Sequence, residues 1–105
     1  MTGIKEIYIA AENWAEGEWN YEDDNTDVIV TMDNNRKYVA TFFTYGNINS
    51  LRQKNKKTGE CFSGKYFWAS DMILIDDCSR NSIEKVIKHL IIEDEFYQTF
   101  NEIKN

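Results

Sequence analysis

The fold is decided by the stretch DVIVTMDNNRKYVATFFTY, residues 27–45. In its first six residues the apolar Val28, Val30 and Met32 alternate with other side chains, which is the two-residue period of a β-strand. The Asp-Asn-Asn that follows favours a turn, because these residue types tolerate positive φ. Residues 37–45 are rich in β-branched and aromatic side chains, so they predict the second strand of a β-hairpin.

Further elements are expected on both sides of this hairpin. In chain order they are a short strand at 4–9, a helical turn or a loop at 10–18, a helix at 47–56 that ends before Gly59, a loop at 60–65, and strands at 66–69 and 72–76. The last two strands form either a tight hairpin or one bent strand.

The C-terminal third has the 3.6-residue apolar spacing of a helix, from Ile83 to Ile91. Asn81 followed by Glu84 predicts a capping box at its start. Asp94 is expected to cap a second helical segment, which carries Phe96, Phe100 and Ile103. Strands first and helices last predict an α+β fold: an antiparallel β-sheet of about four to five strands, with a C-terminal helix or helix pair packed on one face.

The chain has 105 residues, which is the length of one domain, so residues 1–105 are expected to form a single globular unit. The formal net charge of −6 argues against a general nucleic-acid binder. The charge is unevenly spread: residues 1–35 sum to −8, residues 36–65 to +6 and residues 66–105 to −4. Either the blocks remain apart and steer a charged partner, or they mix in space and cancel.

The N-terminal residues lack the apolar core of a secretory signal, and no apolar run is long enough to span a membrane. A small secreted domain usually carries more than the two cysteines found here, Cys61 and Cys78. A cytoplasmic protein with two reduced thiols is therefore expected, with a structural disulfide or a metal site as the alternatives.

Two segments match known binding loops only in part. Residues 59–66 follow the P-loop spacing, but Tyr66 stands where Ser or Thr should hold magnesium. The acids from Asp23 onward resemble the start of an EF-hand, but Val28 and Asn34 replace the required Gly and Glu. A flexible loop and a solvated acidic loop, respectively, explain them better.

Catalytic and metal-binding residues are sparse. The cysteines are 17 residues apart and His89 is the only histidine, which does not give the paired spacing of a zinc site. A hydrolytic site would have to use His89 or the Asp76-Asp77 pair. We therefore expect no enzyme activity, no cofactor, no metal and no catalytic residue.

The strongest functional signal is a run of acids interleaved with aromatic residues near the N-terminus. Large rigid side chains anchor protein interfaces and charges steer the encounter. Alternatively, Trp14 and Trp19 cap the hydrophobic core under a loop. The predicted partner-binding residues are Glu12, Trp14, Glu16, Glu18, Trp19, Tyr21, Glu22, Asp23, Asp24 and Asp27.

Residues 27–60, with DVIVTMDNNRKYVATFFTYGNINSLRQKNKKTGE, and residues 64–91, with GKYFWASDMILIDDCSRNSIEKVIKHLI, carry a family resemblance. Over residues 12–91 the chain resembles small bacterial immunity proteins of polymorphic-toxin and contact-dependent growth inhibition systems. The resemblance implies a cytoplasmic protein that binds and neutralises a cognate toxin domain, often a nuclease. It implies no particular contact residue. The alternatives are another regulatory or adaptor module, as a monomer or a weak homodimer paired through a sheet edge, and a small enzyme.

Overall fold

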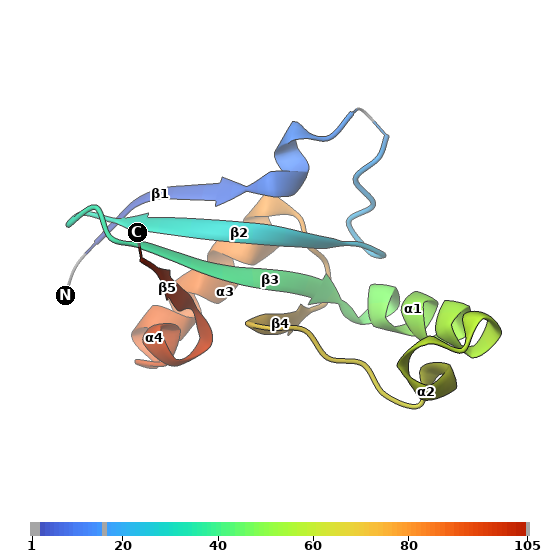
Figure 1. The fold of residues 1–105 in the computed structure, drawn as a ribbon. Helices are drawn as coiled ribbons and strands as arrows, with labels where there is room; N and C mark the ends of the chain where they lie inside the picture. The colour runs from blue at the N-terminus through green and yellow to red at the C-terminus, as the bar shows by residue number, and fades with distance from the viewer. Residues whose placement is uncertain (1–2, 16, 105) are drawn as a thin grey trace.

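The hairpin of residues 27–45 forms the centre of one β-sheet (Figure 1). The computed structural model describes residues 3–15 and 17–104. Along the chain the elements are β1 (Ile4–Ile9), the 3-10 helix η1 (Ala10–Asn13), β2 (Asn25–Met32), β3 (Lys37–Thr44), α1 (Tyr45–Thr58), α2 (Glu60–Gly64), β4 (Met72–Ile75), α3 (Arg80–Ile92), α4 (Phe96–Thr99) and β5 (Asn101–Ile103).

The sheet is built outward from β2 and β3, which pair antiparallel with Val28 opposite Ala40 and Val30 opposite Tyr38. The turn between them places Asn35 at a φ of 66°, as the Asp-Asn-Asn sequence predicts. β1 pairs antiparallel with β2, and β5 pairs antiparallel with the first half of β3. β4 lies parallel to the second half of β3. The predicted α+β fold is confirmed, and the β3–β4 pair is the one parallel pairing in the described sheet.

One face of the sheet carries the hydrophobic core. Phe42 of β3 lies 6.2 Å from Phe100, and Tyr38 lies 5.6 Å from Phe96, measured between ring centroids. Figure 1 shows α3 running behind the strands on this side. The core residues that are fully or almost fully buried include Ile9, Val28, Val30, Met32, Ala40, Phe42, Ile75, Cys78, Ile83, Ile87, Phe96 and Phe100.

The two longer helices begin at side-chain caps. Thr44 caps α1 by accepting a hydrogen bond from the backbone N–H of Asn47, and α1 ends at Gly59 in the left-handed conformation, as predicted. Ser79 caps α3, because its hydroxyl accepts a hydrogen bond from the N–H of Ser82. The predicted capping box of Asn81 with Glu84 is therefore wrong.

The last helical segment is shorter than predicted. Asp94 adopts a positive φ in the turn after α3, and the N-cap of α4 is Glu95, with no side-chain hydrogen bond. The rings of Phe96 and Phe100 stack 4.5 Å apart in the core, and the chain then extends as β5 along β3. Ile103 consequently belongs to a strand. Residues 66–69 form no strand, because the chain there crosses irregularly from α2 to β4.

The α1–α2 lobe, residues 45–68, lies beyond the end of the sheet, so the molecule measures 46 × 30 × 28 Å (Figure 1). α1 buries only Asn55. In α2, Cys61, Phe62 and Ser63 have φ values of 50°, 53° and 59°, which form a left-handed turn. This backbone conformation costs roughly 1–2 kcal/mol for each residue with a Cβ atom.

Candidate partner-binding surface

The predicted binding residues start on η1, continue through the acidic loop, defined as residues 14–24, and end in β2. The sequence places five carboxylates and no basic residue in this loop. Glu16 lies outside the described residues. The structure separates the others into side chains that hold the loop in place and side chains that face solvent.

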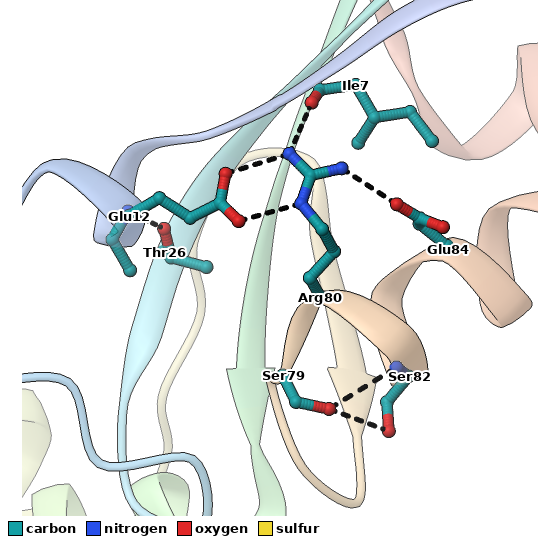
Figure 2. Close-up of polar contacts among 8 residues, drawn as sticks. Ile7, Glu12, Thr26, Ser79, Arg80, Ser82 and Glu84 are labelled. Carbon is teal, nitrogen blue, oxygen red and sulfur yellow. Dashed lines mark hydrogen bonds and ion pairs between the residues drawn. The ribbon is translucent and has the colours of Figure 1, made fainter.

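Glu12 belongs to the first group (Figure 2). Its carboxylate accepts two hydrogen bonds from the Arg80 guanidinium, at 2.7 and 2.8 Å, and Arg80 also donates to Glu84 at 2.7 Å. A fourth bond runs from Arg80 to the backbone oxygen of Ile7 in β1, at 2.8 Å. The hydrogen bonds from Arg80 hold the pKa of Glu12 below its usual value. Glu12 therefore joins η1 to α3, and its carboxylate oxygens are already paired within the protein.

Trp19 also faces inward. It is half-buried against the core, and its indole N–H donates to the Cys78 sulfur at 3.3 Å. The backbone N–H of Cys78 donates to the backbone oxygen of Tyr21 at 2.8 Å, which joins the loop to the start of α3. Burial raises the pKa of the Cys78 thiol. The alternative in which a tryptophan caps the core describes Trp19, whereas Trp14 is exposed.

Two further acids attach the loop to the start of α1. Asp23 accepts hydrogen bonds from the side chains of Asn47 at 3.1 Å and Ser50 at 2.7 Å. A carboxylate at the N-terminus of a helix is favoured by the helix dipole. Asp24 accepts from the backbone N–H of Asn20 at 3.2 Å, and its own backbone oxygen accepts from Thr44 at 3.1 Å.

Asp27 is set apart from the loop. It lies within β2 and points to the sheet face opposite the core, where its carboxylate accepts a hydrogen bond from the Thr41 hydroxyl at 2.7 Å. Glu18 is exposed and accepts from the backbone N–H of Ala15 at 2.9 Å. The structure therefore does not gather all the predicted acids on one loop.

The outward-facing residues of the acidic loop are Trp14, Tyr21 and Glu22 together with Glu18. Trp14 is 37% exposed and Tyr21 is 51% exposed. The backbone beside Tyr21 and Glu22 is anchored by hydrogen bonds from Cys78 to the Tyr21 backbone oxygen and from Thr44 to the Asp24 backbone oxygen, whereas the N–H of Trp14 donates to the Ala11 oxygen in η1. The arrangement is an acidic surface with two aromatic anchors, held in shape before any partner binds.

The charge blocks of the sequence meet at two ion pairs, Arg80 with Glu12 and Arg36 with Glu102. Among the described residues, no ion pair joins the acidic loop to a base of residues 36–65. The bases of the middle block lie mainly on α1, beyond its first turn. The acids of the loop border the N-terminus of the same helix. The acidic loop and the bases of α1 therefore lie beside each other without a direct ion pair between the described residues.

The candidate catalytic residues do not converge. Asp76 and Asp77 line an open pocket of about 360 Å³ with Lys85, and His89 is not among the lining residues. Hydrogen bonds from Ser79 and Ser82 keep the pKa of Asp77 below its usual value, so it would remain a carboxylate rather than act as an acid.

Within residues 3–15 and 17–104, no three His, Cys, Asp or Glu side chains are grouped as metal ligands would be. Both cysteines are free thiols. In the same part of the chain, none of the helices has the length and apolar character needed to cross a bilayer.

Two features were missed by sequence reasoning. Arg80 lies 68 residues from Glu12, so no local pattern connects them. Trp68 falls in a predicted strand but is 70% exposed. The signal that could have indicated its exposure is the neighbouring Lys-rich helix, which has few apolar residues to bury.

Comparisons with protein families, with curated proteins and with solved structures find no match to the chain. No relative therefore assigns a role to any of these residues.

Proposed function

We propose that the chain is a cytoplasmic immunity protein that neutralises a toxin domain by binding to it, without catalysis. The observation that carries the proposal is the acidic loop, whose backbone is anchored internally while Trp14, Tyr21 and Glu22 remain exposed. The resemblance of residues 12–91 to immunity proteins supports the same role.

The chemistry of a nuclease toxin suits this surface. A nuclease presents positive charge to the phosphates of its substrate, so an acidic inhibitor can occupy the same site. A preorganised loop loses little conformational entropy on binding, and complexes of this kind are among the tightest known. The proposed action is occlusion of the toxin's substrate site.

Coexpression tests the proposal directly. The toxin probe is the C-terminal domain of the protein encoded immediately upstream, produced with and without this chain. We expect growth arrest without the chain, rescue with it, and a stable one-to-one complex after purification. Absence of both rescue and complex would refute the proposal.

A matched pair of charge reversals tests the surface. Glu22→Lys changes the acidic loop, whereas Glu93→Lys makes the same change at the exposed end of α3. We expect Glu22→Lys to slow association by about threefold or more at low salt, with little effect of Glu93→Lys, because charges at the binding surface steer the encounter. Equal rates for the two variants in surface plasmon resonance would exclude the acidic loop as the binding surface.

A further inference from the structure

The α1–α2 lobe carries a concentration of positive charge that the proposed acidic surface does not use. Residues 45–68 contain five bases and one acid, Glu60. All five bases are exposed: Arg52, Lys54, Lys56, Lys57 and Lys65. Glu60 approaches only Lys54, at 4.0 Å between charged atoms. The lobe therefore has a net positive surface on a chain whose overall charge is negative.

Exposed aromatic rings accompany these bases. Phe62 is 69% exposed, Tyr66 57% and Trp68 70%. Large aromatic side chains are enriched at protein interfaces. Because α1 buries only Asn55, the lobe does little for the hydrophobic core. Phe67 packs on Phe43 of β3, with ring centroids 5.4 Å apart, whereas the rings of Phe62, Tyr66 and Trp68 are available to a partner.

A cavity of about 260 Å³ lies between α1 and the chain that leaves α2. Ile48 and Phe67 give it an apolar lining, and Arg52 and Lys65 add positive charge. Gly64 brings the two walls close together: a Cβ atom there would lie 2.7 Å from the Arg52 backbone oxygen, and its φ is 78°. The turn that leads into Gly64 is held by backbone hydrogen bonds from Ser63 to Gly59 and from Lys65 to Cys61, both at 3.2 Å, and strained backbone of this kind clusters at functional sites.

We propose that the α1–α2 lobe binds an acidic segment of a partner protein. An apolar side chain of the acidic segment enters the cavity, and the carboxylates of the segment face Arg52 and Lys65, with the exposed ring of Phe62 beside Lys65. The match of opposite charge supports this partner, since carboxylates pair well with arginine and lysine. The proposal does not depend on the immunity function, because it concerns a different surface.

The observations favour an acidic protein over a nucleic acid. A nucleic-acid strand carries a charge about every 3.4 Å, so a strand longer than the lobe meets the acidic surface at the start of α1, whereas a short acidic segment can stay within the lobe. Glu22 and Asp23 would repel it there. The Lys65 ammonium also lies 4.4 Å from the centre of the Phe62 ring, on a ring face where a base would stack.

Fluorescence anisotropy on the full chain tests the proposal. The probe is a labelled peptide in which Asp and Glu alternate with Leu, and the comparisons are the same peptide with Lys at each acidic position and an oligothymidylate of equal charge. We expect saturable binding of the acidic peptide alone. Arg52→Glu combined with Lys65→Glu should weaken it by about tenfold or more.

The control is Lys88→Glu combined with Lys104→Glu, which makes the same charge change at exposed positions outside the lobe. It should change the affinity by less than about twofold. Gly64→Ala leaves the charge intact but disturbs the cavity wall, so it should also weaken binding while circular dichroism shows the fold preserved. Weakening by Gly64→Ala would support the cavity as well as the charge.

Three results would overturn the proposal. The first is no saturable binding of the acidic peptide, or equal weakening by the lobe and control variants. The second is preferential binding of oligothymidylate, which would make the lobe a nucleic-acid site. The third is concentration-dependent self-association that the lobe variant abolishes, which would identify a second copy of the chain as the occupant.

Discussion

Replacing Arg80 with methionine should destabilise the protein by about 2 kcal/mol. Arg80→Met keeps most of the aliphatic stem and removes all four hydrogen bonds of the guanidinium. The side chains of Arg80, Glu12 and Glu84 are 39%, 36% and 33% exposed, so solvent screens the two ion pairs and each contributes only about 0.5 kcal/mol. The charged hydrogen bond to the Ile7 carbonyl adds about 1 kcal/mol.

Thermal unfolding followed by circular dichroism measures this effect. In a domain of this size, 2 kcal/mol corresponds to a fall in Tm of about 10 °C. Arg36→Met is the control, because Arg36 is 63% exposed and its nearest carboxylate, in Glu102, is 3.9 Å away. The control should lower Tm by no more than about 2 °C. Equal shifts in the two variants would show that the Arg80 network does not stabilise the fold.

The same comparison has a defined pH dependence. The pKa of Glu12 is lower in the folded protein than its ordinary value of 4.5. A carboxylate with a lowered pKa stabilises the folded state above its unfolded pKa, and this contribution is lost as the pH falls through the folded pKa. The difference between wild type and Arg80→Met should therefore be full at neutral pH and shrink below about pH 4.5. A constant difference down to acid unfolding would contradict the role given to Glu12.

Two further predictions concern the start of α3 and the two thiols. Ser79→Ala should lower the free energy of unfolding in urea by about 1 kcal/mol because it removes the N-cap, whereas Asn81→Ala should have little effect. A larger loss of stability for Asn81→Ala than for Ser79→Ala would instead support the predicted capping box. A thiol reagent at pH 8 should label Cys61 first and Cys78 only after unfolding, because burial protects Cys78 and raises its pKa. Fast labelling of both thiols in the native protein would contradict the burial of Cys78.

The parts of the fold that follow local rules could be predicted from the sequence. The alternation of residues 27–32 and the Asp-Asn-Asn turn determine the hairpin, and Gly59 determines the end of α1. Ser79, rather than Asn81, is the helix cap in a local network in which Asp77 accepts hydrogen bonds from Ser79 and Ser82. The bond from Arg80 to Glu12, 68 residues away in the chain, follows from no local pattern.

The binding surface could be predicted only in part, for a related reason. The acids of residues 12–27 look equivalent in the sequence. In the structure Glu12 and Asp23 are held by internal hydrogen bonds, whereas Glu22 is exposed. Packing between distant segments decides which of these acids face solvent. The periodicity of the sequence does not predict that packing. The left-handed turn of α2 is equally hidden, because residues such as Phe62 rarely adopt positive φ.

The chain joins the neighbouring parallel strands β3 and β4 through the α1–α2 lobe, which contacts the sheet near its two ends, where Asn47 accepts a hydrogen bond from Asn25 and Phe67 packs on Phe43. Substitutions and length changes in loops that bury little are tolerated thermodynamically. Natural variants of this protein can therefore change the lobe's sequence at small folding cost, while the core positions of the sheet and α3 stay constrained. A change in the partner would then select for substitutions in the lobe while the sheet and α3 stay the same.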